Sequence, residues 1–210
     1  MPTGRMTRWH VFSFNTRLPW LAISLGVLVS CGSGGGNSGL PPTTSSTSYA
    51  GFGAQAVVLH NAWDAVAFSD PGTLPASGSA AYAGVMQLTL ETGAGALKMD
   101  GAMTLTSNFS SNSLSGTAGN FVDQNEITYS GNLAITGGVL DRAANTGIEY
   151  TYSAIIAGSL SGNSEVFGLS GDLSGDFHGL NHGAISGVVA GSATSSFGTG
   201  YMFGNFIAGQ

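Results

Sequence analysis

The chain has little cysteine and little charge. Only one of its 210 residues is a cysteine, Cys31, and 8% are charged, so no disulfide can form within the chain. The only bases after Cys31 are Lys98 and Arg142, against all eleven acids, which leaves this part with a formal charge of −9. Because phosphate binding needs clustered Lys and Arg, nucleic acid is excluded as a partner. Hydrophobic residues nevertheless make up 42% of the chain, which is enough for a packed core.

An apolar run long enough for a membrane-spanning helix is also missing. Residues 18–30 are an apolar run of 13, whereas a bilayer takes about 20, and the run follows a basic segment as in a signal peptide. It ends in LVSC, residues 28–31, which resembles the lipobox of bacterial lipoproteins. By that resemblance Cys31 is diacylated as the mature N-terminus, and Gly32, which is not Asp, addresses the protein to the outer membrane. The alternative is an ordinary signal peptide with a chance cysteine.

Composition divides the chain into four parts. We expect residues 1–30 to be the signal peptide, 31–48 a flexible linker rich in Gly, Ser and Thr that is lipid-anchored by the lipobox resemblance, 49–79 an irregular lead-in, and 80–210 the folded domain. As a coil, the linker would span roughly 20 to 25 Å. Within the lead-in, residues 54–68 contain an apolar stripe at helical spacing, but the segment is short and lacks a clear cap. We therefore expect it to be irregular or strand-like.

From Ala80 onward the side chains alternate with the period of two that is typical of strands. The clearest stretch is 168–191, GLSGDLSGDFHGLNHGAISGVVAG, where one face alternates large residues with glycine and the other carries mostly Ser, Asp and His. Such a face suits the crowded interior of a small closed barrel. The expected strands are 80–90, 96–108, 113–121, 127–136, 147–160, 164–178, 183–193 and 197–207. Because most links are short, we predict an all-β, up-and-down antiparallel barrel of about eight strands.

The outward positions of these strands carry mostly Ser, Thr, Asn, Asp, Glu and Ala. A membrane-spanning barrel would place bulky apolar residues there, flanked by aromatic girdles. The pattern favours a lipid-anchored barrel outside the bilayer. A small membrane-spanning outer-membrane barrel is the less favoured alternative.

Four stretches resemble the β-barrel domain of the transferrin-binding protein B family of surface lipoproteins. They are SGSAAYAGVMQL near Tyr82, MTLTSNFSSNSLSGTAGNF from Met103, GNLAITGG from Gly131, and residues 168–191, in which His178 stands where tyrosine is usual. The resemblance covers roughly residues 77–210. It implies a binding module on the cell surface, with haem, an iron carrier or another host factor as ligand and a surface-lipoprotein translocon as partner. Transferrin-binding members have two lobes with handle domains, whereas this chain has room for one barrel.

The sequence shows no catalytic constellation. Serine nucleophile elbows, Walker loops, HExxH and CxxC motifs are all missing. We therefore predict a protein that is not an enzyme, with no catalytic residues, no metal site and no cofactor beyond the haem or iron that the resemblance implies. The alternative function is a structural or adhesive surface lipoprotein without a small ligand.

Four side chains are candidates for ligand binding: His60, Trp63, His178 and His182. His178 and His182 flank a turn, and a solvated turn is the alternative to a ligand pair because no third metal ligand lies nearby. Asp176 is expected to solvate the outer face of its strand. For Trp63, packing at one end of the barrel is the alternative to stacking on a ligand.

Lipidation at Cys31 yields the first testable prediction. Labelled palmitate should enter the wild-type protein and not the Cys31→Ala variant, because the acylated group is the cysteine itself. The variant should also leave the membrane fraction on cell fractionation. Equal labelling of the two proteins would show that Cys31 is not the attachment site.

Overall fold

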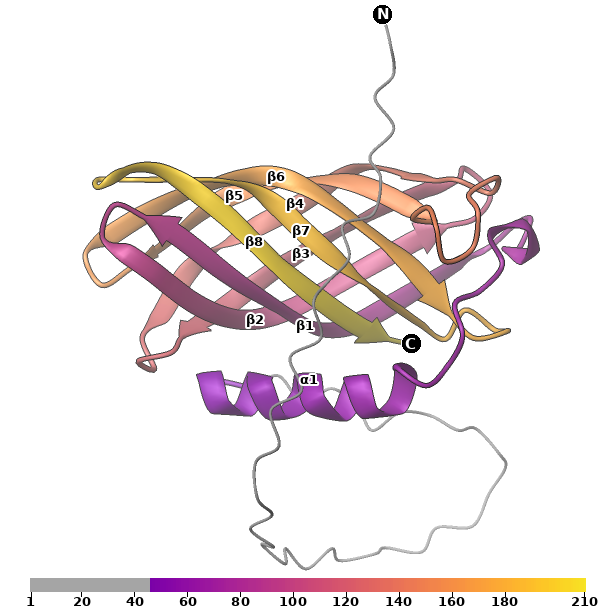
Figure 1. Cartoon of the computed structure of the whole chain (residues 1–210), viewed down its shortest axis with the longest axis horizontal. Coiled ribbons are helices and arrows are strands. Elements are labelled where there is room, and N and C mark those ends of the chain that lie inside the picture. The colour runs from indigo at the N-terminus through magenta and orange to yellow at the C-terminus, as the bar shows by residue number, and fades with distance from the viewer. Residues whose placement is uncertain (1–45) are drawn as a thin grey trace, which may run out of the picture. The chain divides into compact units, whose positions relative to one another are not determined.

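The structure, a computed structural model, describes residues 46–210. In this part eight strands close into one antiparallel barrel, in which neighbours in sequence pair and β8 pairs with β1 (Figure 1). The strands are β1 (Ser79–Thr92), β2 (Gly95–Asn108), β3 (Ser113–Asp123), β4 (Thr128–Leu140), β5 (Tyr152–Gly162), β6 (Glu165–His178), β7 (Ala184–Ser195) and β8 (Gly198–Gly209). The predicted all-β barrel is confirmed. The predicted signal peptide, Cys31 and most of the linker lie outside the described residues.

The start of β5 differs from the expected strand. Residues 147–151 belong to a loop of residues 141–151, and the strand begins only at Tyr152. The backbone N–H and the hydroxyl of Thr151 both donate to the carboxylate of Asp176, at 3.1 and 3.0 Å. This contact buries Asp176 on the outer face of β6. The expectation that Asp176 solvates the barrel is therefore wrong, because the long loop covers it.

The lead-in contains a helix, α1 (Tyr49–Trp63), so the prediction of an irregular or strand-like segment is wrong there. Its N-cap is Ser48, whose hydroxyl accepts a hydrogen bond from the backbone N–H of Gly51 at 3.1 Å. The carboxylate of Glu126, in the β3–β4 turn, accepts from the N–H groups of Tyr49 and Ala50 at 3.0 and 3.4 Å. These free N–H groups and the helix dipole favour a negative charge. A residue distant in sequence thus helps to start α1.

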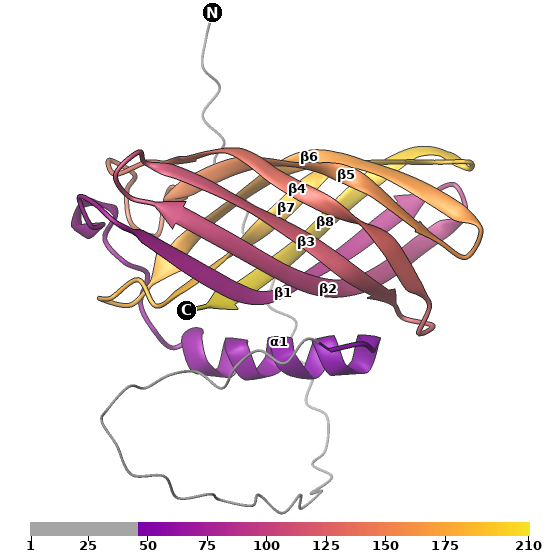
Figure 2. The same ribbon diagram turned by 180° about the vertical axis from the view of Figure 1, so that it is seen from behind.

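Apolar packing then holds α1 along the outside of the barrel (Figure 2). Phe52 and Ala56 pack with Val85 of β1 and Val122 of β3 in a small core separate from the barrel interior. Beneath the helix lies the buried Asp100 carboxyl group, which accepts a hydrogen bond from the Gln87 side chain at 2.9 Å. Burial raises the pKa of Asp100, because desolvation disfavours the charged form.

The barrel interior is filled by side chains, with aromatic rings lying over glycines. Tyr152 lies against Phe177, with ring centroids 5.4 Å apart, and pairs across strands with Gly175. A Cβ atom on Gly175 would overlap both the Tyr152 hydroxyl and the backbone of the neighbouring strand β7. Glycine is therefore required where the rings meet the wall. The predicted alternation of large residues and glycine on the inward face of residues 168–191 is confirmed.

The two ends of the barrel differ. We call the end with the β2–β3 turn, the 141–151 loop and the β6–β7 turn the closed end, and the end with the other four hairpin turns the open end. At the closed end, the Arg142 guanidinium donates to the backbone carbonyls of Leu74, Pro75 and Phe109 at 2.6 to 3.0 Å. It also donates to the side chain of Asn112 at 2.6 Å. One cation thus ties the lead-in and two loops together over the barrel end.

Replacing Gly175 by Val should destabilise the barrel by about 3 kcal/mol, because the new side chain overpacks the space beside Tyr152. The matched outward change, Ser174→Val, should be nearly neutral, within about 0.5 kcal/mol. Urea denaturation of the two variants measures the difference. Greater damage from Ser174→Val would contradict the inward assignment of Gly175.

Candidate functional site

Because side chains fill the interior, space for a ligand is found at the open end. Two cavities lie there, on either side of the β3–β4 hairpin, and Tyr129 of β4 lines both. We call the first the mouth pocket and the second the outer groove.

The mouth pocket has a volume of about 340 Å³ and is lined by all four hairpin turns of the open end. The β1–β2 turn contributes Ala94, the β3–β4 turn Gln124, the β5–β6 turn Asn163 and the β7–β8 turn Phe197. Asn163 and Ser164 both have positive φ, 50° and 61°, as a two-residue hairpin turn requires. The tight turns therefore place these side chains around the barrel end.

Asp123 fixes the β3–β4 turn at the edge of the mouth pocket. Its carboxylate is buried and accepts hydrogen bonds from the N–H groups of Asn125 and Ile127 at 2.8 and 3.0 Å. The Tyr129 hydroxyl donates to the same carboxylate at 3.2 Å. Burial, followed by the charge of Asp123, raises the pKa of Tyr129 to about 12, so this hydroxyl stays protonated and can keep donating.

Glu165 fixes the β7–β8 turn in the same way, through hydrogen bonds to its carboxylate. Its carboxylate accepts from the Ser196 hydroxyl at 2.6 Å and from the Ser196 N–H at 2.7 Å. These hydrogen bonds lower the pKa of Glu165, because they favour the charged form. The turn therefore holds Phe197 at the rim, where the side chain is 58% exposed.

The electrostatics of the mouth pocket are one-sided. Its lining includes the carboxylates of Asp123 and Glu165 and contains no Lys or Arg. The amides of Gln124, Asn125 and Asn163 add uncharged donors and acceptors. An opposite charge favours binding and a like charge opposes it, so the pocket suits a neutral or cationic polar ligand better than an anion.

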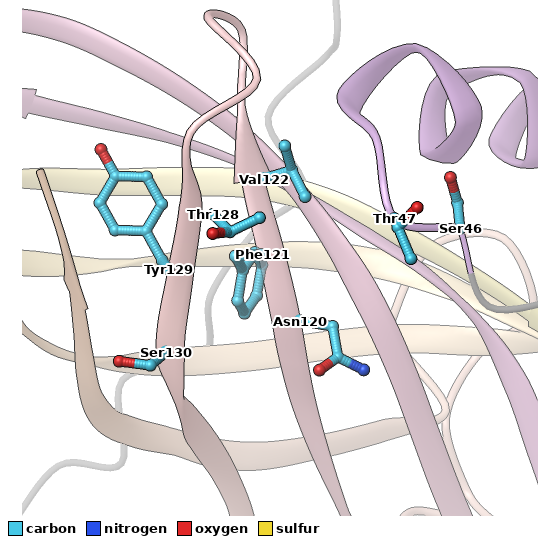
Figure 3. Close-up of a pocket in the computed structure, with 8 residues that line it drawn as sticks. All are labelled: Ser46, Thr47, Asn120, Phe121, Val122, Thr128, Tyr129 and Ser130. Atoms are coloured by element: carbon cyan, nitrogen blue, oxygen red, sulfur yellow. The ribbon is translucent and has the colours of Figure 1, made fainter.

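The outer groove has a volume of about 410 Å³ and lies between the start of the described chain and the β3–β4 hairpin (Figure 3). One wall is Ser46 and Thr47, and the other is formed by Asn120, Thr128 and Ser130 with their neighbours (Figure 3). The strand register shifts between Gly119 and Phe121, and Asn120, at φ 54°, occupies this irregularity. A bulge of this kind re-aims a side chain. The groove lining combines the hydroxyl and amide groups with the apolar side chains of Phe121 and Val122, and it contains no charged residue.

The predicted ligand residues do not meet at either cavity. His60 donates through Nδ1 to the carboxylate of Asp64 at 3.0 Å on the surface of α1. Trp63, at the end of α1, lies over Gly179 and Gly183 in the β6–β7 turn at the closed end. A side chain larger than hydrogen at Gly183 would contact the Trp63 ring. This placement matches the packing role considered for Trp63.

His178 and His182 are both buried, each 4% exposed, so the alternative of a solvated turn is wrong. His178 lies outside the barrel wall, where Nδ1 donates to the Val66 carbonyl at 3.2 Å and Nε2 meets the Ser186 hydroxyl at 2.7 Å. The Phe68 ring covers it at a centroid distance of 4.9 Å. The lead-in is therefore what buries His178.

His182 lies on the other side of the barrel wall from His178. Its ring is 6.0 Å from that of Phe177 and 6.3 Å from that of Phe109, and no hydrogen bond to its Nδ1 is present. The two histidines therefore do not converge as a ligand pair. Within residues 46–210, no three His, Cys, Asp or Glu side chains gather closely enough to hold a metal ion.

The pairing of His178 and Ser186 resembles part of a hydrolase site. Because the Val66 carbonyl can only accept, Nδ1 carries the proton, and in a neutral ring Nε2 then accepts from the Ser186 hydroxyl. Attack on a carbonyl would also need N–H donors for the developing oxyanion. The backbone at both residues is engaged in pairing: His178 with Ala184 and Phe68, and Ser186 with Asp176 and Ile207. The arrangement is better explained as a clamp that fastens the lead-in to the barrel.

A scan against known protein families and a search of curated proteins both return no match. Among residues 46–210, no helix is long and apolar enough to cross a membrane. The side chains that line the mouth pocket, such as Gln124 and Phe197, were not among those predicted from the sequence. The polar link of residues 123–126 was the available signal, but only closure of the barrel brings Phe197 to the same rim.

Replacing Asp123 by Ala should loosen the open end and destabilise the protein by about 3 kcal/mol, because two N–H groups and the Tyr129 hydroxyl lose their acceptor. Urea denaturation gives the free energy, and hydrogen exchange should speed up at the amides of Asn125 and Ile127. The exposed neighbour provides the control, since Asn125→Ala should change stability by less than about 0.5 kcal/mol. Unchanged exchange in Asp123→Ala would contradict this role.

Proposed function

We propose that the protein is a lipid-anchored, non-catalytic binding module of the outer-membrane surface, which takes its ligand at the open end of the barrel. The observation that carries the proposal is the filled interior together with two cavities beside one hairpin at that end. A ligand-binding site requires concavity and a few fixed polar groups. The mouth pocket has both, since Asp123 and Glu165 hold the turns that form it.

The site favours one class of ligand over another. The lining has two carboxylates, three side-chain amides and no Lys or Arg, which suits a neutral or cationic polar ligand, or the polar segment of a host protein. Haem carries propionates, and the two histidines that might have bound its iron are buried at the other end of the barrel. An iron carrier that docks as a protein is therefore more compatible with this end than free haem. The supply of iron rests on the family resemblance alone.

The adhesive alternative is supported by an observation of its own. On the outside of β8, Tyr201 is 72% and Phe203 45% exposed, and they face Ser192 and Ala190 of β7. Exposed aromatic side chains are typical of protein-binding surfaces. An adhesive protein would use this wall of the barrel, whereas a binding module of the proposed kind would use the mouth.

Hydrogen exchange can separate the two functions. The chain from residue 31 with Cys31→Ala should be passed over immobilised transferrin and whole serum, and titrated with haem while the Soret band is monitored. With a bound partner, protection should appear at residues 92–97, 123–125, 163–165 and 197. Protection confined to residues 201–203 would favour adhesion, and turnover of a lipid or glycan substrate would contradict a non-catalytic module.

Two substitutions test the mouth directly. Phe197→Ala and Gln124→Ala should each weaken binding by about tenfold, or about 1.4 kcal/mol, because each removes contact surface at the rim. Ser115→Ala, at an exposed position of β3 near the closed end, is the control and should bind like the wild type. A Soret shift that is lost in His178→Ala would instead locate a haem ligand at the closed end.

A further inference from the structure

Helix α1 is apolar on both of its faces. One face packs on the barrel through Phe52, Ala56 and Leu59. We call the opposite, exposed side the outer face of α1; it consists of Ala50, Ala54, Val57, Val58, Asn61 and Ala62. Val57 is 57% and Val58 50% exposed.

The apolar residues of the outer face are spaced along the sequence like those of a buried helix face. They follow one another at i, i+4, i+7, i+8 and i+12, the pattern of a helix face that packs on something. A surface helix normally turns charged or polar side chains to water. Here the outer face contains no charged residue and one amide, Asn61, so its composition fits an apolar partner better than water.

We propose that the outer face of α1 lies on the lipid surface to which the chain is anchored. This inference rests on the proposed lipidation of Cys31. Tyr49 follows Cys31 by 18 residues, so of the described elements α1 is the one nearest in sequence to the anchor. A helix with one apolar face can lie in the boundary between headgroups and acyl chains.

With the signal peptide removed, as lipidation of Cys31 requires, the linker before α1 does not offer another cover. Between Cys31 and Ser46 the only large apolar side chain is Leu40. A second copy is also a poor fit, because a stable dimer buries roughly 800 Å² on each partner. Six mostly small side chains on one 15-residue helix provide less.

Charge favours the same orientation. The part of the chain after Cys31 is strongly acidic, and acidic surfaces are repelled by anionic lipid. The outer face of α1 carries none of the acids. The two carboxylates at the helix ends are engaged, Asp64 with His60 and Glu126 with the helix N-terminus. The outer face itself therefore adds no charge that anionic lipid would repel, and the exposed carboxylate nearest to it in sequence is that of Asp64 at the helix end, 68% exposed.

Alanine and valine side chains bury little area, so the face should bind lipid only when the anchor supplies a high local concentration. Lipidated and unlipidated protein should accordingly behave differently. The lipid holds the molecule at the membrane, and α1 sets which side of the barrel faces it.

The test uses the full lipidated chain with an environment-sensitive fluorophore on a new thiol. Val57→Cys is the probe, and Ala157→Cys, exposed on β5 away from α1, is the matched control. Cys31 does not react because its sulfur is acylated. In vesicles of phosphatidylethanolamine and phosphatidylglycerol that contain brominated lipid, the probe at 57 should shift to the blue and be quenched, while the probe at 157 should do neither.

Further variants make the outcomes distinct. Adding Val58→Asp to the probe at 57 should abolish the quenching, while the protein stays in the membrane fraction through its lipid. Equal signals from 57 and 157 in palmitate-labelled protein would overturn the docking of α1 and leave the anchor intact. Failure of palmitate labelling would overturn both. A blue shift at 57 without vesicles that grows with protein concentration would show a second copy on this face and refute the lipid contact.

Discussion

The narrow interior of the closed barrel is the constraint on which the rest of the structure depends. Eight strands enclose just enough space for side chains, and the Tyr152 ring fits only because Gly175 faces it across the strands. Gly187 likewise leaves room for Phe206. Once these rings are in place, no room is left for a ligand among them. A ligand must therefore bind at the ends or on the outer wall of the barrel, where side chains are not confined by the interior.

The two ends of the barrel are held by different contacts. At the closed end the lead-in returns over the barrel and is fixed by Arg142, by the Ser186 and Val66 contacts of His178, and by the Ser69 hydroxyl, which donates to the Gly179 carbonyl at 2.6 Å. Each polar group buried by these contacts has a hydrogen-bond partner, so its burial costs little free energy. The open end has only short turns, held from within by Asp123 and Glu165. The amides of the mouth pocket and the Phe197 ring take no part in the hydrogen bonds of Asp123 and Glu165, so they are the groups that the proposed ligand would meet.

The helix α1 links the folded domain to the predicted membrane anchor. Its inner face is fixed by Phe52 and its start by Glu126, so α1 cannot turn about its axis without losing both contacts. The side that it presents outward is thus set by the barrel. Since Glu126 belongs to the β3–β4 hairpin, the helix start, the outer groove and the mouth pocket are joined through one turn.

The barrel could be predicted from the sequence, because strand patterning is local. Alternation at period two in residues 168–191 identifies inward and outward positions without knowledge of the neighbours. Short hairpin links then leave few ways to connect the strands. For the same reason most strand bounds agree within two residues. The exceptions are β4, which continues to Leu140 instead of ending at residue 136, and β5, whose expected residues 147–151 lie in a loop where Thr151 bonds to Asp176.

Features that depend on long-range contacts could not be predicted from local sequence patterns. The sequence showed an apolar stripe, and Ser48 is a local cap for α1. The contacts that also hold the helix, from Glu126, 77 positions from Tyr49, and between Phe52 and Val85, are long-range. His178 has the outward position that its pattern predicts, yet the Phe68 segment buries it. The mouth pocket likewise exists only after closure has brought four turns together. The sequence by itself determined which face each strand residue takes, because that depends on the local backbone; the tertiary structure decided what covers each face, because burial depends on residues far away in the chain.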